Sequence, residues 1–61
     1  MKVRDVIKIV ESDGWRLVRH RGSHRQYQQA WKPGIVTIFG NPGVEMPLGT
    51  LRSVLKQAGL K

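Results

Sequence analysis

The first apolar residues of the chain recur with the spacing of a helix. Four of them stand at positions i, i+3, i+4 and i+7, so they form one stripe of an amphipathic helix. They are Val3, Val6, Ile7 and Val10. Gly14 follows this stripe, and glycine readily takes the left-handed conformation that ends a helix. The pattern therefore predicts a helix over residues 3–13.

The hydrophobic pattern then changes to that of a β-hairpin. Residues 15–21 ("WRLVRHR") mix β-forming and charged side chains, and residues 24–29 ("HRQYQQ") continue this mixture. Gly22 and Ser23 lie between the two segments and are typical turn residues. We therefore expect two antiparallel strands joined at Gly22 and Ser23.

The second strand of this hairpin divides its side chains between two faces, because successive side chains of a strand point in opposite directions. One face carries His24, Gln26 and Gln28, and the other carries Arg25, Tyr27 and Gln29. The sequence alone does not fix the register, so it leaves open which of the two faces is buried.

Two loops and a third strand follow the hairpin. In residues 30–34 ("AWKPG"), Pro33 and Gly34 supply the chemistry of a turn. Residues 35–39 ("IVTIF") are rich in β-branched side chains and predict the strongest strand of the chain. Residues 40–47 ("GNPGVEMP") contain two glycines and two prolines, which predict a constrained loop.

The last part of the chain returns to helical spacing. An apolar stripe begins near the start of a predicted second helix, with Arg52 and Lys56 turned away from it. The stripe consists of Leu48, Leu51, Val54, Leu55 and Ala58. Gly59 and Leu60 have the pattern of a C-terminal glycine cap with its apolar contact.

These elements predict a single domain over residues 1–61 with an α+β fold. The order α-β-β-β-α gives a three-stranded antiparallel sheet with two helices packed on one face. A chain of 61 residues buries only about 60% of the surface that its unfolded form exposes, so any functional site must lie on the surface. We expect the face of the sheet away from the helices to carry much of the arginine-rich hairpin.

The amino-acid composition indicates which class of partner the protein binds and in which compartment it is found. Eleven Lys and Arg against four Asp and Glu give a net charge of +7, and no acid occurs between Gly14 and Val44. This clustering favours a face that binds a polyanion or an acidic protein over a merely solvated surface. The chain has no cysteine, charges interrupt its N-terminal apolar segment, and no window approaches the roughly 18 apolar residues of a membrane span. We expect a soluble, cytoplasmic protein.

The segment "GSHRQY" combines residues that suit chemistry on RNA. His24 follows the tight turn, and its imidazole changes charge in the physiological range, which suits proton transfer. Arg25 beside it, with Arg19 and Arg21 on the preceding strand, can bind a phosphate through forked donors. RNA supplies its own nucleophile in the 2′-hydroxyl, so a base, a charge stabiliser and alignment could suffice without a metal.

Simpler interpretations stay open for each of these residues. A single histidine in a basic hairpin is more often a surface or turn residue than a catalyst. Tyr27 fits a half-buried strand aromatic better than a base-stacking platform, and Trp15 and Trp31 fit core or edge packing. The spacing of His20 to His24 dictates no metal site, and we assign none. Ser23 fits a turn role better than a nucleophilic one.

Nearly the whole chain, from Arg4 to Leu60, resembles the HicA family of toxins from bacterial toxin–antitoxin pairs. The resemblance is most specific at "GSHRQY" and at "GTLRSVLKQAGL". It implies a double-stranded-RNA-binding-domain-like α-β-β-β-α fold, ribonuclease activity on messenger RNA and neutralisation by a HicB antitoxin. It also implies that His24 is the functional histidine. Where family members often read "GHPGKDIP", this chain reads "GNPGVEMP", so Asn41 replaces a second histidine.

The interpretation that follows is a small endoribonuclease that needs no metal or cofactor. His24 is the predicted catalytic base, and the predicted RNA-binding residues are Arg19, Arg21, Ser23, Arg25 and Tyr27. His20 is a candidate proton donor only if the hairpin register brings it beside His24. The predicted partners are messenger RNA and a larger, acidic HicB-type antitoxin, and a monomer is the expected free form. The alternative is a module that binds double-stranded RNA without chemistry.

Overall fold

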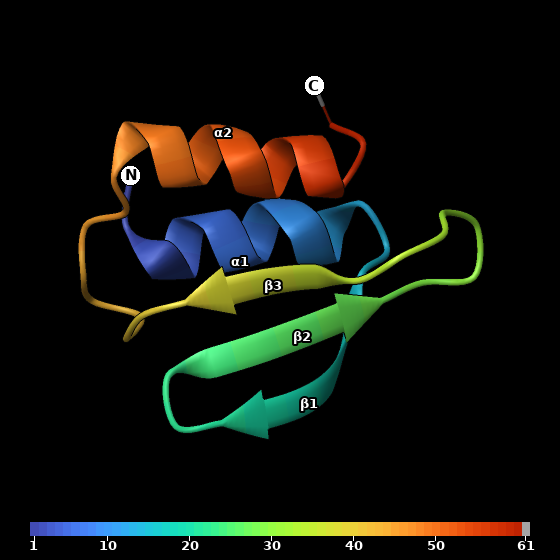
Figure 1. Ribbon diagram of the computed structural model, residues 1–61, viewed down its shortest axis with the longest axis horizontal. Coiled ribbons are helices and arrows are strands. Elements are labelled where there is room, and N and C mark those ends of the chain that lie inside the picture. Colours follow the sequence, from blue (N-terminus) through green and yellow to red (C-terminus); the bar gives the residue numbers. More distant parts are fainter. Residues whose placement is uncertain (61) are drawn as a thin grey trace.

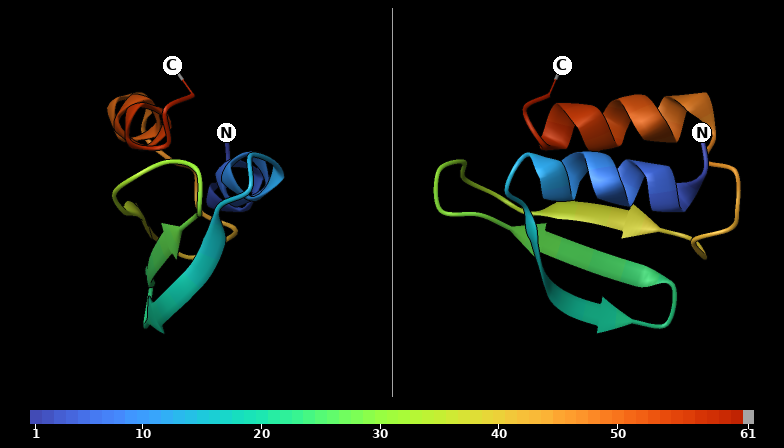
Figure 2. Two further views of the ribbon diagram at one scale, coloured as in Figure 1. Left: turned by 90° about the vertical axis from the view of Figure 1, so that its right-hand side faces the viewer. Right: turned by 180° about the vertical axis from the view of Figure 1, so that it is seen from behind.

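The computed structural model describes residues 1–60 and confirms the predicted order α-β-β-β-α (Figure 1). Its elements are α1 (Val3–Ser12), β1 (Arg16–Arg21), β2 (His24–Gln28), β3 (Val36–Phe39) and α2 (Leu48–Gln57). The strands form one antiparallel sheet in the order β1-β2-β3. Both helices lie beside β3, and β1 forms the far edge of the sheet (Figures 1 and 2). Lys61, the last residue of the predicted domain, lies outside the described residues.

The core lies between the helices and the sheet, and α1 enters it as predicted. Val3, Val6 and Val10 are buried, and Ile7 packs partly against them. The helix ends at Ser12, one residue before the predicted end. Gly14 has a φ of 99°, so it takes the left-handed conformation expected of a residue that ends a helix. The other buried residues of the core are Trp15, Tyr27, Val36, Ile38, Met46, Val54 and Ala58.

A bulge in β1 determines which side chains of the hairpin share a face. Leu17 pairs with Tyr27, but Arg19 pairs with Gln26, so Val18 is an extra residue on β1. Paired residues in an antiparallel sheet point to the same side, so Leu17 and Arg19 point to opposite sides of the sheet. Without the bulge, the alternation along β1 would place them together.

The apolar stripe of α2 is only partly buried. Val54 and Ala58 lie in the core, and Leu51 and Leu55 are partly buried. Leu48 is 60% exposed, which corrects the prediction that it belongs to the buried stripe. Because α2 reaches the core through its second half, its first turn has little apolar surface to pack against.

The two tryptophans differ in their surroundings. Trp15 is fully buried in the core, which confirms the prediction of a packing role. Trp31 is 85% exposed, so the prediction that it packs in the core or at an edge is wrong. It lies in the connection between β2 and β3, which extends beyond the ends of the strands (Figure 1).

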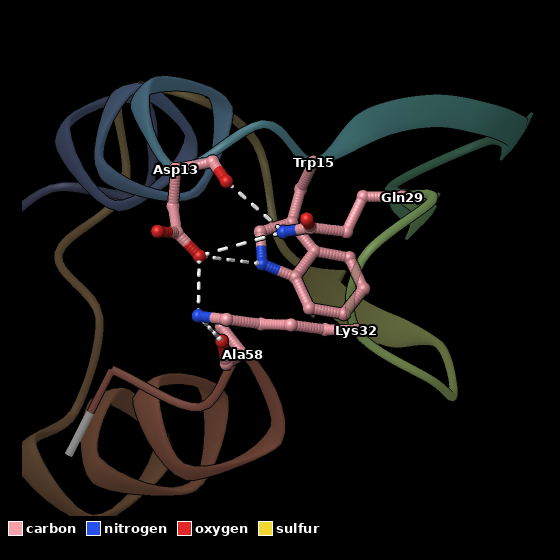
Figure 3. Close-up of polar contacts among 5 residues, drawn as sticks. All are labelled: Asp13, Trp15, Gln29, Lys32 and Ala58. Atoms are coloured by element: carbon pink, nitrogen blue, oxygen red, sulfur yellow. Dashed lines mark hydrogen bonds and ion pairs between the residues drawn. The ribbon is translucent and has the colours of Figure 1, made fainter.

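A polar cluster ties the connection between β2 and β3 to the ends of both helices (Figure 3). Lys32 Nζ lies 2.7 Å from Asp13 Oδ2 and donates a 3.0 Å hydrogen bond to the carbonyl of Ala58. The Trp15 indole donates to Asp13 Oδ2 at 3.2 Å, and Gln29 Nε2 donates to the Asp13 carbonyl at 3.0 Å. The hydrogen bond from Lys32 is the main reason that the pKa of Asp13 is lowered.

This cluster predicts an acid-sensitive part of the fold's stability. Asp13 binds a proton more readily in the unfolded chain than in the folded chain. The stabilisation that its carboxylate gives to the fold is therefore complete above the ordinary carboxyl pKa of 3.8 and is lost as pH falls through the lower folded pKa. Asp13→Asn should therefore lower the melting temperature near neutral pH. The difference in melting temperature between the variant and the wild type should become smaller as pH falls below 3.8.

Thermal unfolding of both proteins from neutral to strongly acidic pH measures this gap. Glu11→Gln is the matched control, because Glu11 is exposed on α1 and the change removes the same charge. A gap that stays constant over the whole range, or one that the control reproduces, would show that the Asp13 carboxylate contributes nothing specific.

Candidate active site

The sheet face turned away from the helices carries two rows of paired side chains. Val36 and Ile38 of β3 are buried under the helices, so their neighbours Thr37 and Phe39 point to the other side, here named the open face. The pairing across the three strands then sets the rows. The first row is Arg21–His24–Phe39 and the second is Arg19–Gln26–Thr37. Side chains directly opposite each other in such rows have Cβ atoms about 4.5–5.5 Å apart.

A surface hollow lies over the β1 and β2 members of these rows. Its volume is about 200 Å³, and its lining residues are Arg19, Arg21, His24 and Gln26. Two arginines, one histidine and one glutamine thus line a single concave site, and none of the four residues is acidic. Such a set can bind an anion beside a group that transfers protons.

His24 stands at the first position of β2, where neighbouring contacts fix the backbone. Gly22 has a φ of 56° in the turn before it, and the Ser23 carbonyl accepts a 2.9 Å hydrogen bond from the Gly40 amide. The His24 ring is exposed and lies 4.5 Å, centroid to centroid, from the ring of Phe39. The two rings are nearly perpendicular, at 87°, which is a favourable aromatic geometry. The imidazole is thus exposed but held by a neighbour.

Arg25 does not join this group, although it follows His24 in the sequence. It pairs with the buried Ile38, so its side chain leaves the sheet on the opposite side. There its Nη1 donates a 2.9 Å hydrogen bond to the carbonyl of Gly40. This placement corrects the prediction that Arg25 and His24 act on one phosphate. Arg25 instead braces the end of β3 behind the open face.

Tyr27 also departs from its predicted place on the RNA-binding surface. Its side chain is 1% exposed within the core, and burial raises the pKa of its hydroxyl. The prediction of an RNA contact is therefore corrected, because a ligand cannot reach a ring enclosed by the helices and the sheet. The interpretation as a strand aromatic agrees with this position, and the ring is fully rather than half buried.

The register also decides the position of His20. It pairs with Arg25, on the side opposite to His24, and its Nε2 lies 2.9 Å from the Gly22 carbonyl. The condition under which His20 could serve as a proton donor beside His24 is therefore not met. Ser23, the second turn residue, is partly buried and contributes its carbonyl to the contact with Gly40.

The sequence interpretation missed three members of the open face. Gln26, Thr37 and Phe39 complete the two rows, yet none was singled out as a site residue. Alternation along β2 already placed Gln26 with His24. For Thr37 and Phe39 the missing step was the phase of β3, although the polar Thr37 between Val36 and Ile38 already favours burial of those two neighbours.

Among residues 1–60, no group of three or more His, Cys, Asp or Glu side chains is placed to share a metal ion. Within the same residues, neither helix has the length and apolar character needed to cross a bilayer.

Comparison with known proteins supports one family. The family described as HicA toxin of bacterial toxin–antitoxin matches residues 3–60. A search of curated proteins finds no match. The match covers both rows of the open face and all five elements of the fold. The chain therefore belongs to the HicA toxin family and is the toxin component of a bacterial toxin–antitoxin pair.

Proposed function

We propose that this toxin is an endoribonuclease that cuts messenger RNA with His24 as general base. The observation that carries the proposal is the hollow on the open face that His24 lines together with Arg19 and Arg21. A toxin that must attack a polyanion needs an anion site and a proton acceptor within reach of each other. The open face offers both on adjacent strands.

The proposed reaction uses the RNA's own nucleophile. The neutral His24 imidazole accepts the proton of a 2′-hydroxyl, and the resulting 2′-oxygen attacks the adjacent phosphorus. The bond from phosphorus to the 5′-oxygen of the next nucleotide breaks, and that oxygen takes a proton from solvent. The products are a 2′,3′-cyclic phosphate and a 5′-hydroxyl. No side chain is assigned as the proton donor, since His20 faces away.

Arg19 and Arg21 would hold the phosphate and offset the charge that develops on its oxygens. Both side chains are exposed and belong to β1, one in each row. Guanidinium groups form paired hydrogen bonds with phosphate oxygens and stay protonated at any pH of interest. Their hydrogen bonds would strengthen as negative charge accumulates in the transition state.

The antitoxin, which we propose to be of the HicB type, would act by covering the open face. A partner with acidic side chains over Arg19 and Arg21 would occupy the hollow and exclude RNA from His24. The net charge of +7 would also speed the encounter with such a partner.

Incubation of the purified protein with end-labelled messenger RNA in a metal chelator tests the proposed activity. We expect the RNA to be shortened, because the proposed step draws only on side chains of the open face. If the RNA keeps its full length while a gel shift shows tight binding to duplexes, the protein is a double-stranded-RNA-binding module and the proposal is wrong.

A further inference from the structure

Phe39 is an exposed aromatic side chain that the proposed cleavage step does not use. It is 52% exposed on the open face, although Val36 and Ile38 on the same strand are fully buried. Leaving an aromatic ring in water forgoes the free energy that its burial would supply. Phe39 also ends the row that contains His24, and its ring lies 4.5 Å, centroid to centroid, from the imidazole proposed as the catalytic group.

The row places this ring on the side of His24 away from the arginines. Arg21 lies on β1, His24 on β2 and Phe39 on β3. Neighbouring strands are about 4.8 Å apart, so the row spans roughly 10 Å from β1, which carries the arginine, to β3, which carries the aromatic ring. A nucleotide whose phosphate lies in the hollow would extend its sugar past His24 and its base over β3.

Polar neighbours of Phe39 suit the edge of a base. Thr37 lies next to it on β3, two residues back on the same face, and pairs with Gln26 on β2. A base that stacks on the ring would have its edge within reach of a hydroxyl and an amide, both of which can donate and accept hydrogen bonds. The apolar platform and its polar border therefore resemble the sheet surfaces on which proteins stack single-stranded bases.

We infer that Phe39 is a stacking platform for the nucleobase beside the scissile phosphate, with Thr37 and Gln26 at the edge of that base. The inference rests on the proposed ribonuclease function and names the substrate as unpaired RNA. Stacking on an aromatic side chain tolerates any base, so Phe39 would add affinity and set the position of the phosphate rather than select a sequence.

An abasic scan of RNA that resists cleavage tests the inference. 2′-O-methyl oligoribonucleotides carry no 2′-hydroxyl proton, so binding can be measured without the proposed reaction. One abasic nucleotide is moved along the strand, and each oligonucleotide is titrated against the wild type and Phe39→Leu. The wild type should lose about five- to hundredfold in affinity at one abasic position. Phe39→Leu should bind the intact strand more weakly and show no such loss.

Two further variants complete the test. Phe39→Tyr keeps the ring and should again lose affinity when the base at that one position is missing. Trp31→Leu removes an exposed aromatic in the connection between β2 and β3, outside the two rows, and should behave like the wild type. An equal loss of affinity in the wild type and in Phe39→Leu, or no loss at any abasic position, would overturn the inference. Because binding is measured without cleavage, a Phe39-dependent penalty in a protein that never shortens RNA would contradict only the proposed function.

Discussion

Replacing His24 with glutamine should reduce RNA cleavage by about two to four orders of magnitude, the range that general acid–base catalysis supplies. Glutamine can still donate and accept hydrogen bonds, but it cannot take up a proton at ordinary pH. His24 is exposed and its one aromatic contact is with Phe39, so the fold and its melting temperature should change little. Single-turnover cleavage of labelled RNA, with circular dichroism of both proteins, measures the effect.

His20→Gln is the matched control for this experiment. His20 lies four residues away, on the opposite side of the sheet, and makes a local contact with the Gly22 carbonyl. Its replacement should leave the cleavage rate within a few-fold of the wild type. Equal losses in the two variants, or undiminished cleavage by His24→Gln, would rule out His24 as the base.

Removing the two arginines of the hollow should weaken RNA binding more than removing two charges elsewhere. Arg19→Gln/Arg21→Gln deletes two guanidinium groups that line the hollow. Each charge-assisted hydrogen bond to a phosphate is worth at least about tenfold in affinity. Two lost phosphate contacts should also reduce the slope of log affinity against log salt by about 1.4 for single-stranded RNA. Titration of an oligoribonucleotide at several salt concentrations measures both quantities.

The control has the same net charge but leaves the open face intact. Arg4→Gln/Arg52→Gln removes two exposed arginines from α1 and α2, which lie on the other side of the sheet. It should weaken binding only through the general field and leave the salt slope nearly unchanged. If both double variants lose the same affinity and slope, the RNA does not bind in the hollow.

The sequence predicts the fold because its local patterns agree with one another. The valines of α1 recur at helical spacing, Gly14 ends the helix, and Gly22 and Ser23 close the hairpin, so each element has its own signal. The stripe of α2 was predicted too long. Spacing identifies the side of a helix that can be buried, but tertiary packing decides how many turns are covered, and Leu48 is left exposed.

The site was less predictable, because it depends on register. Alternation already separates Arg25 from His24, yet closeness in sequence favoured grouping them, and the structure places Arg25 against Gly40. The turn sets Arg21 opposite His24, and alternation then places Arg19 on the same face. The bulge at Val18 turns Leu17 to the opposite face, and no turn or breaker residue in "RLVRHR" signals it.

The burial of Tyr27 and the exposure of Phe39 also depend on how the strands pair. Tyr27 is enclosed and Phe39 is exposed, the reverse of what their polarity suggests. The reason is that β3 turns Val36 and Ile38 inward, and pairing with β2 then carries Tyr27 inward as well. In "IVTIF" only Val36 and Ile38 form a wholly apolar phase, because the other phase contains Thr37. Alternation therefore favours burial of these two residues, but the burial of Tyr27 follows only once the pairing of β2 with β3 is known.

The chemistry of the RNA ends tests the central claim most directly, because it reports which oxygen attacked the phosphorus. If His24 removes the proton of a 2′-hydroxyl beside a phosphate held by Arg19 and Arg21, the fragments produced by the wild type carry a 2′,3′-cyclic phosphate and a 5′-hydroxyl. Fragments that instead carry a 5′-phosphate and a free 3′-hydroxyl would mean that activated water attacked, and would contradict this account of the open face.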